Sequence, residues 1–236
     1  MKPVLVIRHI ACEGPGYLAT ALSRANVPWT LCAVDDHASI PDDPTQFSAI
    51  AAMGGPMSVN DDLPWIEQEL TLLRAAHDRG LPLLGHCLGG QMLSKALGGQ
   101  ITRNPVKEIG WLPVSRTDDG AIPNWINGLP PTFDAFHWHG ETFSIPPGAT
   151  RLLGSERCAN QALVAGNTLA LQFHVEVTLD MIDAWAALYA EELRSPSPTV
   201  QSRATMLDRG MERIAQLQRV ADIFYDGWIK RIERVS

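Results

Sequence analysis

Basic side chains are scarce in this sequence of 236 residues. Lysine and arginine together number 19 against 26 aspartate and glutamate residues, which gives a formal net charge of -7. Proteins that bind nucleic acid usually present a basic patch or stripe. The densest basic cluster here is Lys230, Arg231 and Arg234, which we interpret as a solvated helix end. We therefore expect no nucleic-acid partner.

Long hydrophobic runs are also missing. No apolar stretch approaches the roughly 18 residues that a membrane-spanning helix needs. The apolar residues 4–7 are followed directly by Arg8, and no small-residue cleavage site comes after them. This N-terminus predicts a first β-strand and not a signal peptide. We expect a cytoplasmic protein without membrane association.

Cysteine is rare and its spacing is irregular. Cys12, Cys32, Cys87 and Cys158 lie far apart and form no CxxC or Cys/His ligand pattern. This usage is typical of a reduced, intracellular chain with unpaired thiols. We expect no metal and no cofactor, and the question becomes whether one thiol is a nucleophile.

The first hundred residues alternate short apolar runs with amphipathic stretches. The apolar runs 4–7, 30–34, 49–53 and 81–85 predict buried parallel strands, and 16–25 and 63–79 predict helices. This rhythm indicates an α/β fold, a doubly wound and mostly parallel sheet flanked by helices. Ligands of such sheets bind beyond the C-terminal strand ends.

The pattern changes after residue 99. Shorter and partly antiparallel strands are predicted at 110–116, 134–138, 150–154, 162–164 and 168–173, followed by a helix at 179–193. We assign residues 1–194 to one domain and 195–236 to a linker and a C-terminal amphipathic helix.

The predicted last helix, from about 202 to 231, carries a continuous apolar stripe. Its members recur at intervals of three and four residues: Leu207, Met211, Ile214, Leu217, Ala221, Phe224 and Trp228. The hypothesis is that this stripe either mediates homodimerisation or caps the domain.

The segment around Cys87 is the most informative. An apolar strand leads into Gly85-His86-Cys87-Leu88-Gly89 and then into a predicted helix at 91–97. This is the thiol form of a nucleophile elbow, whose sharp turn requires small neighbours. A helix N-terminus favours thiolate, and the Leu88 amide would face a developing oxyanion. The alternative is a small buried cysteine in a tight turn.

His174 and Glu176 are the best partners for such a thiol. They end the predicted strand 168–173, and a spacing of two puts both side chains on one face of extended backbone. The carboxylate would hold the imidazole in one tautomer while the other nitrogen faces the thiol. A third element, Gly54-Gly55-Pro56, follows an apolar strand and would supply a second oxyanion amide from Gly55. Read alone, a His-x-Glu pair is common on protein surfaces, and Gly-Gly-Pro is a turn.

Together, the three motifs resemble the class I (triad type) glutamine amidotransferases. Gly54-Gly55-Pro56, the segment 85–91 and Gln172-Phe173-His174-Val175-Glu176 occur in the order and at the separations of that family. The resemblance covers roughly residues 1–190 and is strongest to stand-alone proteins similar to the amidotransferase domain of GMP synthase.

The resemblance implies specific roles. Cys87 would be the nucleophile, His174 the base and acid, and Glu176 its orienting partner, with amides of Gly55 and Leu88 as the oxyanion hole. It further implies a substrate-binding set made of Gln91, Trp138, His139 and Glu141. Trp138 and His139 are equally well explained as a packed strand end.

The implied reaction is hydrolysis of a γ-glutamyl amide through a thioester on Cys87. Val175 stands where many relatives carry proline, and valine suits extended backbone. The remaining residues show no P-loop or pyrophosphatase-like motif, so ammonia would pass to a separate synthetase partner. Two alternatives remain open: a γ-glutamyl peptide or amine hydrolase without an acceptor, and a non-catalytic binding module on the same fold.

Overall fold

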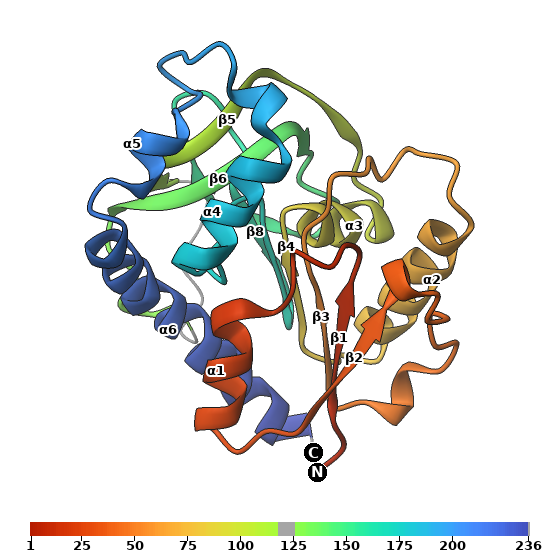
Figure 1. Ribbon diagram of the computed structural model, residues 1–236. Helices are drawn as coiled ribbons and strands as arrows, with labels where there is room; N and C mark the ends of the chain where they lie inside the picture. Colours follow the sequence, from red (N-terminus) through yellow and green to blue (C-terminus); the bar gives the residue numbers. More distant parts are fainter. Residues whose placement is uncertain (118–125, 236) are drawn as a thin grey trace.

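One mixed β-sheet organises the molecule (Figure 1). The computed structural model describes residues 1–117 and 126–235, and within them nine strands follow the order β2-β1-β3-β4-β9-β8-β7-β5-β6. Strands from β2 to β9 pair in parallel, and those from β9 to β6 pair antiparallel. Helices flank the sheet, which confirms the α/β class predicted from the sequence.

The parallel half agrees closely with the predicted elements. Its strands are β1 (Val4–Arg8), β2 (Trp29–Ala33), β3 (Ala49–Ala52), β4 (Leu83–His86) and β9 (Thr168–Leu171). Its helices are α1 (Gly16–Arg24), α2 (Pro64–Asp78) and α3 (Leu88–Ala96). Two short 3-10 turns, η1 (Val34–Asp36) and η2 (Pro44–Gln46), lie between β2 and β3.

The antiparallel half has longer strands than the sequence predicted. A long hairpin pairs β5 (Ile101–Arg116) with β6 (Thr132–Phe143), and β7 (Thr150–Gly154) and β8 (Ala162–Ala165) join it to β9. The predicted helix 179–193 is α4 (Leu179–Leu188) followed by the 3-10 turn η4 (Ala190–Leu193).

Alternating side chains of the strands build a separate core on each face of the sheet. Val4 and Val6 of β1 point into a cluster with α1, α4 and the C-terminal helices. Leu5 and Ile7 of the same strand point into a second cluster with α2 and α3. Burial on both faces explains why these strands are apolar throughout.

The prediction of one continuous C-terminal helix is wrong. The segment forms α5 (Arg203–Leu207) and α6 (Gly210–Val235), separated at Asp208 and Arg209. Arg209 adopts a φ of 53°, and a Cβ on Gly210 would lie 2.4 Å from the Leu179 side chain. The helix therefore restarts at a glycine because its backbone approaches α4 closely there.

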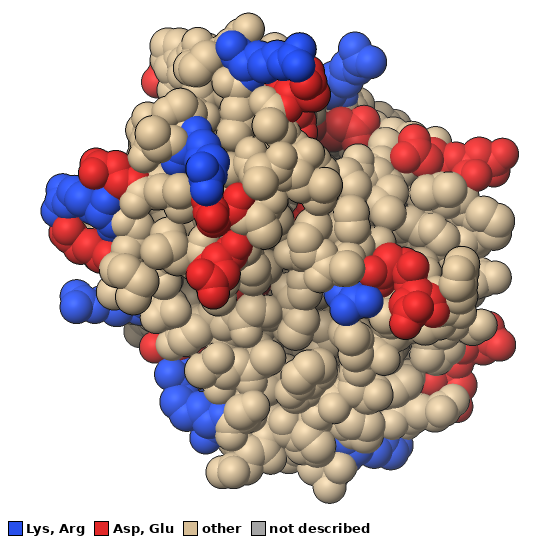
Figure 2. Space-filling view, in the orientation of Figure 1, with Lys and Arg blue, Asp and Glu red and all other residues tan. Residues whose placement is uncertain are grey.

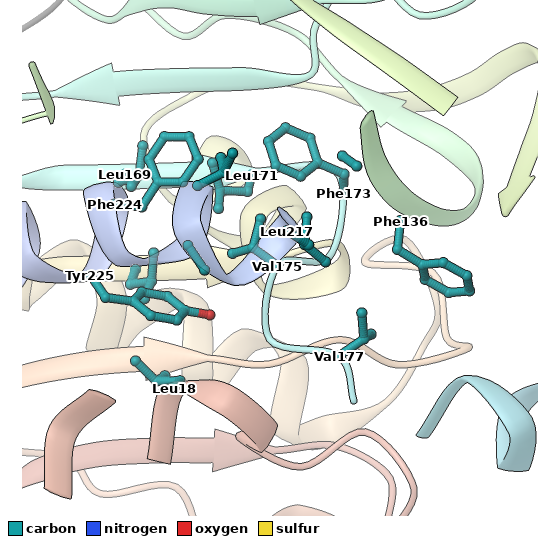
Figure 3. Packing of buried hydrophobic residues seen from close by; sticks show 14 of the residues in the cluster. Leu18, Phe136, Leu169, Leu171, Phe173, Val175, Val177, Leu217, Phe224 and Tyr225 are labelled. Carbon is teal, nitrogen blue, oxygen red and sulfur yellow. The ribbon is translucent and has the colours of Figure 1, made fainter. Parts of the chain in front are cut away.

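The residues after 194 pack onto the domain. The Ile109 amide of β5 donates to the carbonyl of Thr199 at 2.8 Å, and the Gln201 side chain bonds both backbone groups of Trp111. In Figure 3, Phe224 and Tyr225 of α6 lie among Leu169 and Leu171 of β9 and Leu18 of α1. The apolar stripe thus covers its own domain, as the capping hypothesis requires, and leaves Met211 71% exposed.

Charges on the visible surface are dispersed. In Figure 2, the lysine and arginine side chains stand apart among acidic ones and form no basic field.

Within the described residues, no helix combines the length and the apolar character needed to cross a bilayer.

Candidate active site

Cys87 lies at a sharp turn between strand and helix. Strand β4 ends at His86 and α3 begins at Leu88, so Cys87 alone makes the turn, with a φ of 48° and a ψ of -106°. A non-glycine residue with positive φ is strained, and such strain is concentrated at functional sites. The strand-turn-helix geometry that the sequence predicts is present. The role of Cys87 as nucleophile stays a prediction.

Glycines permit this turn. A Cβ on Gly89 would lie 2.0 Å from the carbonyl oxygen of Ala52 in β3, and one on Gly85 would lie 2.4 Å from the carbonyl oxygen of Gly89. Backbone atoms occupy both positions, so no side-chain movement would relieve the contact. The glycines flanking Cys87 are therefore required by the close packing of α3 on β3 and β4.

The Cys87 thiol borders a pocket of about 260 Å³. Its sulfur is 3.7 Å from the Trp138 carbonyl oxygen, and the Gln172 amide nitrogen lies 3.7 Å from the same sulfur. Most of the predicted site residues line this pocket: Gly55, Cys87, Gln91, Trp138, His139 and Glu141.

His174 and Glu176 form a buried pair beside the thiol. The Nδ1 of His174 lies 2.6 Å from Oε1 of Glu176, and both side chains are 1% exposed. The His174 amide donates to the Phe136 carbonyl at 2.8 Å, and the Trp185 ring meets the imidazole edge-on at 4.8 Å. Backbone and ring contacts thus fix the imidazole so that its Nε2 remains for Cys87.

The charges of this pair favour an imidazolium. Burial lowers the pKa of His174, but Glu176 and the hydrogen bond with Cys87 raise it well above its ordinary value. Burial raises the pKa of Glu176, yet His86 and His174 hold it below its ordinary value. A positive charge next to a thiol stabilises the thiolate form.

The two predicted oxyanion-hole residues abut one another. A Cβ on Gly55 would lie 2.9 Å from the Leu88 side chain. Leu88 is the first residue of α3, where backbone amides have no acceptor within the helix. Gly55 therefore lies next to the first turn of α3, and the oxyanion hole formed by the two amides stays a prediction.

The predicted substrate-binding residues occupy different positions. Gln91 points to Gln172, its amide nitrogen 3.3 Å from that side-chain oxygen. The Trp138 indole donates to Glu192 at 3.2 Å. Nδ1 of His139 is hydrogen-bonded to the Glu141 carbonyl at 2.9 Å, and its Nε2 lies 3.0 Å from Oε2 of Glu108. His139 therefore holds the wall of the pocket around Glu141.

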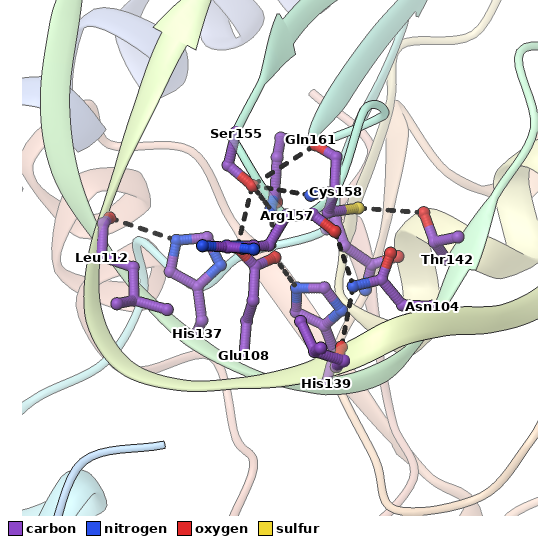
Figure 4. A network of polar contacts seen from close by, with 12 residues as sticks. Asn104, Glu108, Leu112, His137, His139, Thr142, Ser155, Arg157, Cys158 and Gln161 are labelled. Atoms are coloured by element: carbon purple, nitrogen blue, oxygen red, sulfur yellow. Dashed lines mark hydrogen bonds and ion pairs between the residues drawn. The ribbon is translucent and has the colours of Figure 1, made fainter. Parts of the chain in front are cut away.

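Glu108 is the centre of a buried polar network behind this wall (Figure 4). Its carboxylate accepts from Ser155 at 2.8 Å and from Gln161 at 2.7 Å, besides its contact with His139. The side-chain nitrogen and oxygen atoms of Glu108, His137 and His139 that could bind a metal lie within 4.8 Å of one another. Sets of two histidines and a carboxylate bind metal ions in other proteins. Here the carboxylate is held by Ser155 and Gln161, so the network ties the β5–β6 hairpin to the segment between β7 and β8.

Sequence reasoning missed several pocket residues, among them Glu13, Lys107, Tyr189 and Glu192. Lys107 pairs with Glu192 at 2.5 Å. Glu13 follows β1 at the C-terminal edge of the sheet, where ligands of this fold class bind. Its position after a predicted strand could therefore have indicated it as a site residue. Tyr189 and Glu192 gave none, since they reach the pocket only through the packing of α4 and η4.

Glu13 makes stability depend on pH. Burial raises the pKa of Glu13 from 4.5 to about 7, although His174 opposes the shift. In the unfolded chain Glu13 therefore loses its proton at a lower pH than in the folded protein. The free energy of unfolding consequently falls as the pH rises from 4.5 to about 7. We expect Glu13→Gln to unfold at a higher temperature than the unchanged protein at a pH of about 8, with the difference vanishing near pH 4. Equal unfolding temperatures at both values of pH would contradict this ionisation.

Comparisons with known proteins point to one family. The family model described as glutamine amidotransferase class-I matches residues 16–184. A glutamine amidotransferase-like protein, YfeJ of Salmonella typhimurium, is 28% identical over 78% of this chain and 80% of its own length. One subunit of a glutamine-hydrolysing GMP synthase from Sulfurisphaera tokodaii is 36% identical over 56% of this chain and 68% of its own.

A solved structure gives the same answer for nearly the whole chain. The glutamine amidotransferase from Methylobacillus flagellatus superimposes with a TM-score of 0.93 at 40% identity, covering 98% of this chain and 95% of that one. That coverage includes the C-terminal helices. Glutamine hydrolysis with transfer of ammonia is the general chemistry of the matched family, and this chain belongs to the class-I glutamine amidotransferases.

Proposed function

We propose that this protein hydrolyses the γ-amide of glutamine through a γ-glutamyl thioester on Cys87. The observation that carries the proposal is the strained Cys87 turn beside an imidazole held 2.6 Å from a buried carboxylate. Nucleophile, base and orienting group in such an arrangement are the parts of a catalytic triad.

The first half of the reaction breaks the amide bond. The Cys87 thiolate attacks the γ-carbonyl carbon, and the oxyanion that forms accepts hydrogen bonds from the amides of Gly55 and Leu88. As the C–N bond breaks, Nε2 of His174 gives its proton to the nitrogen, which leaves as ammonia. The γ-glutamyl group remains on sulfur as a thioester.

The second half releases glutamate. His174, now neutral, takes a proton from water as the water attacks the thioester carbonyl. The C–S bond then breaks and the thiolate is restored beside the imidazolium. Glu176 keeps the imidazole in one orientation throughout. The carboxyl group of Glu141 in the pocket wall suits the α-ammonium group of the substrate.

The ammonia acceptor belongs to a partner in this proposal. One relative is by its name a subunit of a glutamine-hydrolysing GMP synthase, which supports delivery of ammonia to a separate synthetase chain. The dimer hypothesis receives no such support, because the apolar stripe of α6 is buried within its own chain.

The proposal is tested by measuring glutamate released from glutamine, glutathione and γ-glutamyl amines, with alkylation of Cys87 by a glutamine-like analogue as a second readout. We expect release from glutamine and modification of Cys87. If glutamate is released only from a γ-glutamyl peptide or amine, that compound and not glutamine is the donor. Silence across the panel, with Cys87 unmodified, would leave a binding module as the better account.

A further inference from the structure

One buried carboxyl group in the pocket has no part in the triad. Glu13 is 6% exposed and lines the same pocket as Cys87. Its amide donates to the Ile10 carbonyl at 3.0 Å, which fixes the turn after β1. The Tyr189 hydroxyl donates to its Oε1 at 3.4 Å. The other carboxylate oxygen has a different neighbour.

Oε2 of Glu13 lies against Gly54, as does the imidazole of His174. A Cβ on Gly54 would lie 2.2 Å from Oε2 of Glu13 and 2.9 Å from Cε1 of His174. The absence of a side chain at Gly54 therefore lets the carboxylate and the imidazole border one small space. Because Nδ1 of His174 is bound to Glu176, the nitrogen left to give a proton to a substrate is Nε2, which is bonded to the same Cε1.

The leaving nitrogen of the substrate must enter the same space. It takes a proton from Nε2 of His174, and such a transfer needs a heavy-atom distance of about 3 Å. Glu13 lines the pocket that holds Cys87, and its Oε2 lies near the Cε1 edge of the imidazole across Gly54, so its carboxyl group borders the region that this nitrogen enters. Resting on the function proposed above, we infer that Glu13 binds the leaving nitrogen by accepting a hydrogen bond from its N–H.

This contact requires a substrate whose leaving nitrogen carries at least one hydrogen. With one N–H held by Glu13, the lone pair that develops on nitrogen as the C–N bond breaks is aimed at His174. The proton still comes from His174, the electron pair of the broken bond stays on nitrogen, and Glu13 is unchanged at the end. Primary and singly substituted γ-glutamyl amides carry the required N–H. A γ-glutamyl ester leaves through oxygen and carries none.

The pH dependence of the reaction follows from the same contact. Burial raises the pKa of Glu13 to about 7, and only the ionised group accepts strongly from the amide. The titratable groups that face Glu13 are Cys12, Tyr189, His9, His174 and Glu176. Activity on amides is therefore expected to rise with pH through about 7, in addition to any change that arises from the triad itself.

The experiment compares Glu13→Gln with the unchanged protein on glutamine and on a γ-glutamyl methyl ester. We expect kcat/KM for glutamine to fall about 10- to 100-fold, the range for loss of a charged hydrogen bond. We expect the ester to change less than about twofold, because its leaving oxygen has no hydrogen to donate. The rise of amide activity through neutral pH should disappear in the variant. Glu67→Gln, which changes an exposed carboxyl group on α2, serves as the matched control.

The outcomes separate two failures. In the first, the unchanged protein turns over its substrates, but Glu13→Gln loses amide and ester activity equally or loses neither. That result would overturn the role of Glu13 and leave the proposed function intact. No turnover of either substrate, with Cys87 unreactive toward the glutamine-like analogue, would instead overturn the proposed function.

Discussion

Replacing Cys87 with alanine is expected to reduce glutamate release from glutamine by at least about 10⁴-fold, as removal of a triad nucleophile does elsewhere. The reason is that every bond change in the proposed reaction passes through the Cys87 sulfur. Among the described residues that line the pocket, Cys87 is the one cysteine. The measurement is kcat by detection of glutamate at saturating glutamine.

A matched control exists for this variant. Cys32 is a second buried thiol, 5% exposed, and it lies on β2 at the edge of the sheet, away from the pocket. Cys32→Ala is expected to keep its activity. Activity retained in Cys87→Ala would remove the nucleophile from the account, whereas equal loss in both variants would indicate damage to the fold.

Replacing Phe224 with alanine is expected to lower the free energy of unfolding by about 3 to 5 kcal/mol, the usual cost of removing a buried phenylalanine. Phe224 is fully buried and its ring meets those of Phe133 and Phe173 at 6.5 and 6.4 Å. Met211→Ala, on the same helix but 71% exposed, should change stability by less than about 0.5 kcal/mol. Urea denaturation of both variants gives the comparison.

Helix α6 also connects the tail to the candidate site. The Tyr225 hydroxyl lies 3.1 Å from Nε2 of His86, and the same nitrogen is 3.7 Å from Oε2 of Glu176. We therefore propose that residues 195–236 fold as one unit with residues 1–194. A Phe224→Ala protein as stable as the unchanged one would indicate instead that the tail is only loosely attached.

The parallel half of the sheet was predictable because its signals are local. Each buried strand is a continuous apolar run, and glycine marks the end of α2 and the turn at Cys87. The long β5–β6 hairpin was not, because β5 contains Pro105 within an irregularity of the pairing between Arg103 and Glu108. Proline removes a strand hydrogen bond and usually indicates a break, yet a bulge accommodates it here.

The same contrast holds for the site. Cys87, His174 and Glu176 were found because each stands in a motif of a few residues at a strand end. Glu13 and Tyr189 were missed, since only tertiary packing brings their side chains together in one pocket. The break at Arg209 was missed as well, because its positive φ leaves no mark in a sequence whose apolar spacing continues across it.

The most direct test of the account is the mass of the protein quenched in acid during turnover of glutamine. The account predicts a fraction of molecules heavier by one γ-glutamyl group, with the addition on the peptide that contains Cys87 and none in Cys87→Ala. An addition on Cys12, Cys32 or Cys158, or glutamate release at the unchanged rate by Cys87→Ala, would contradict it.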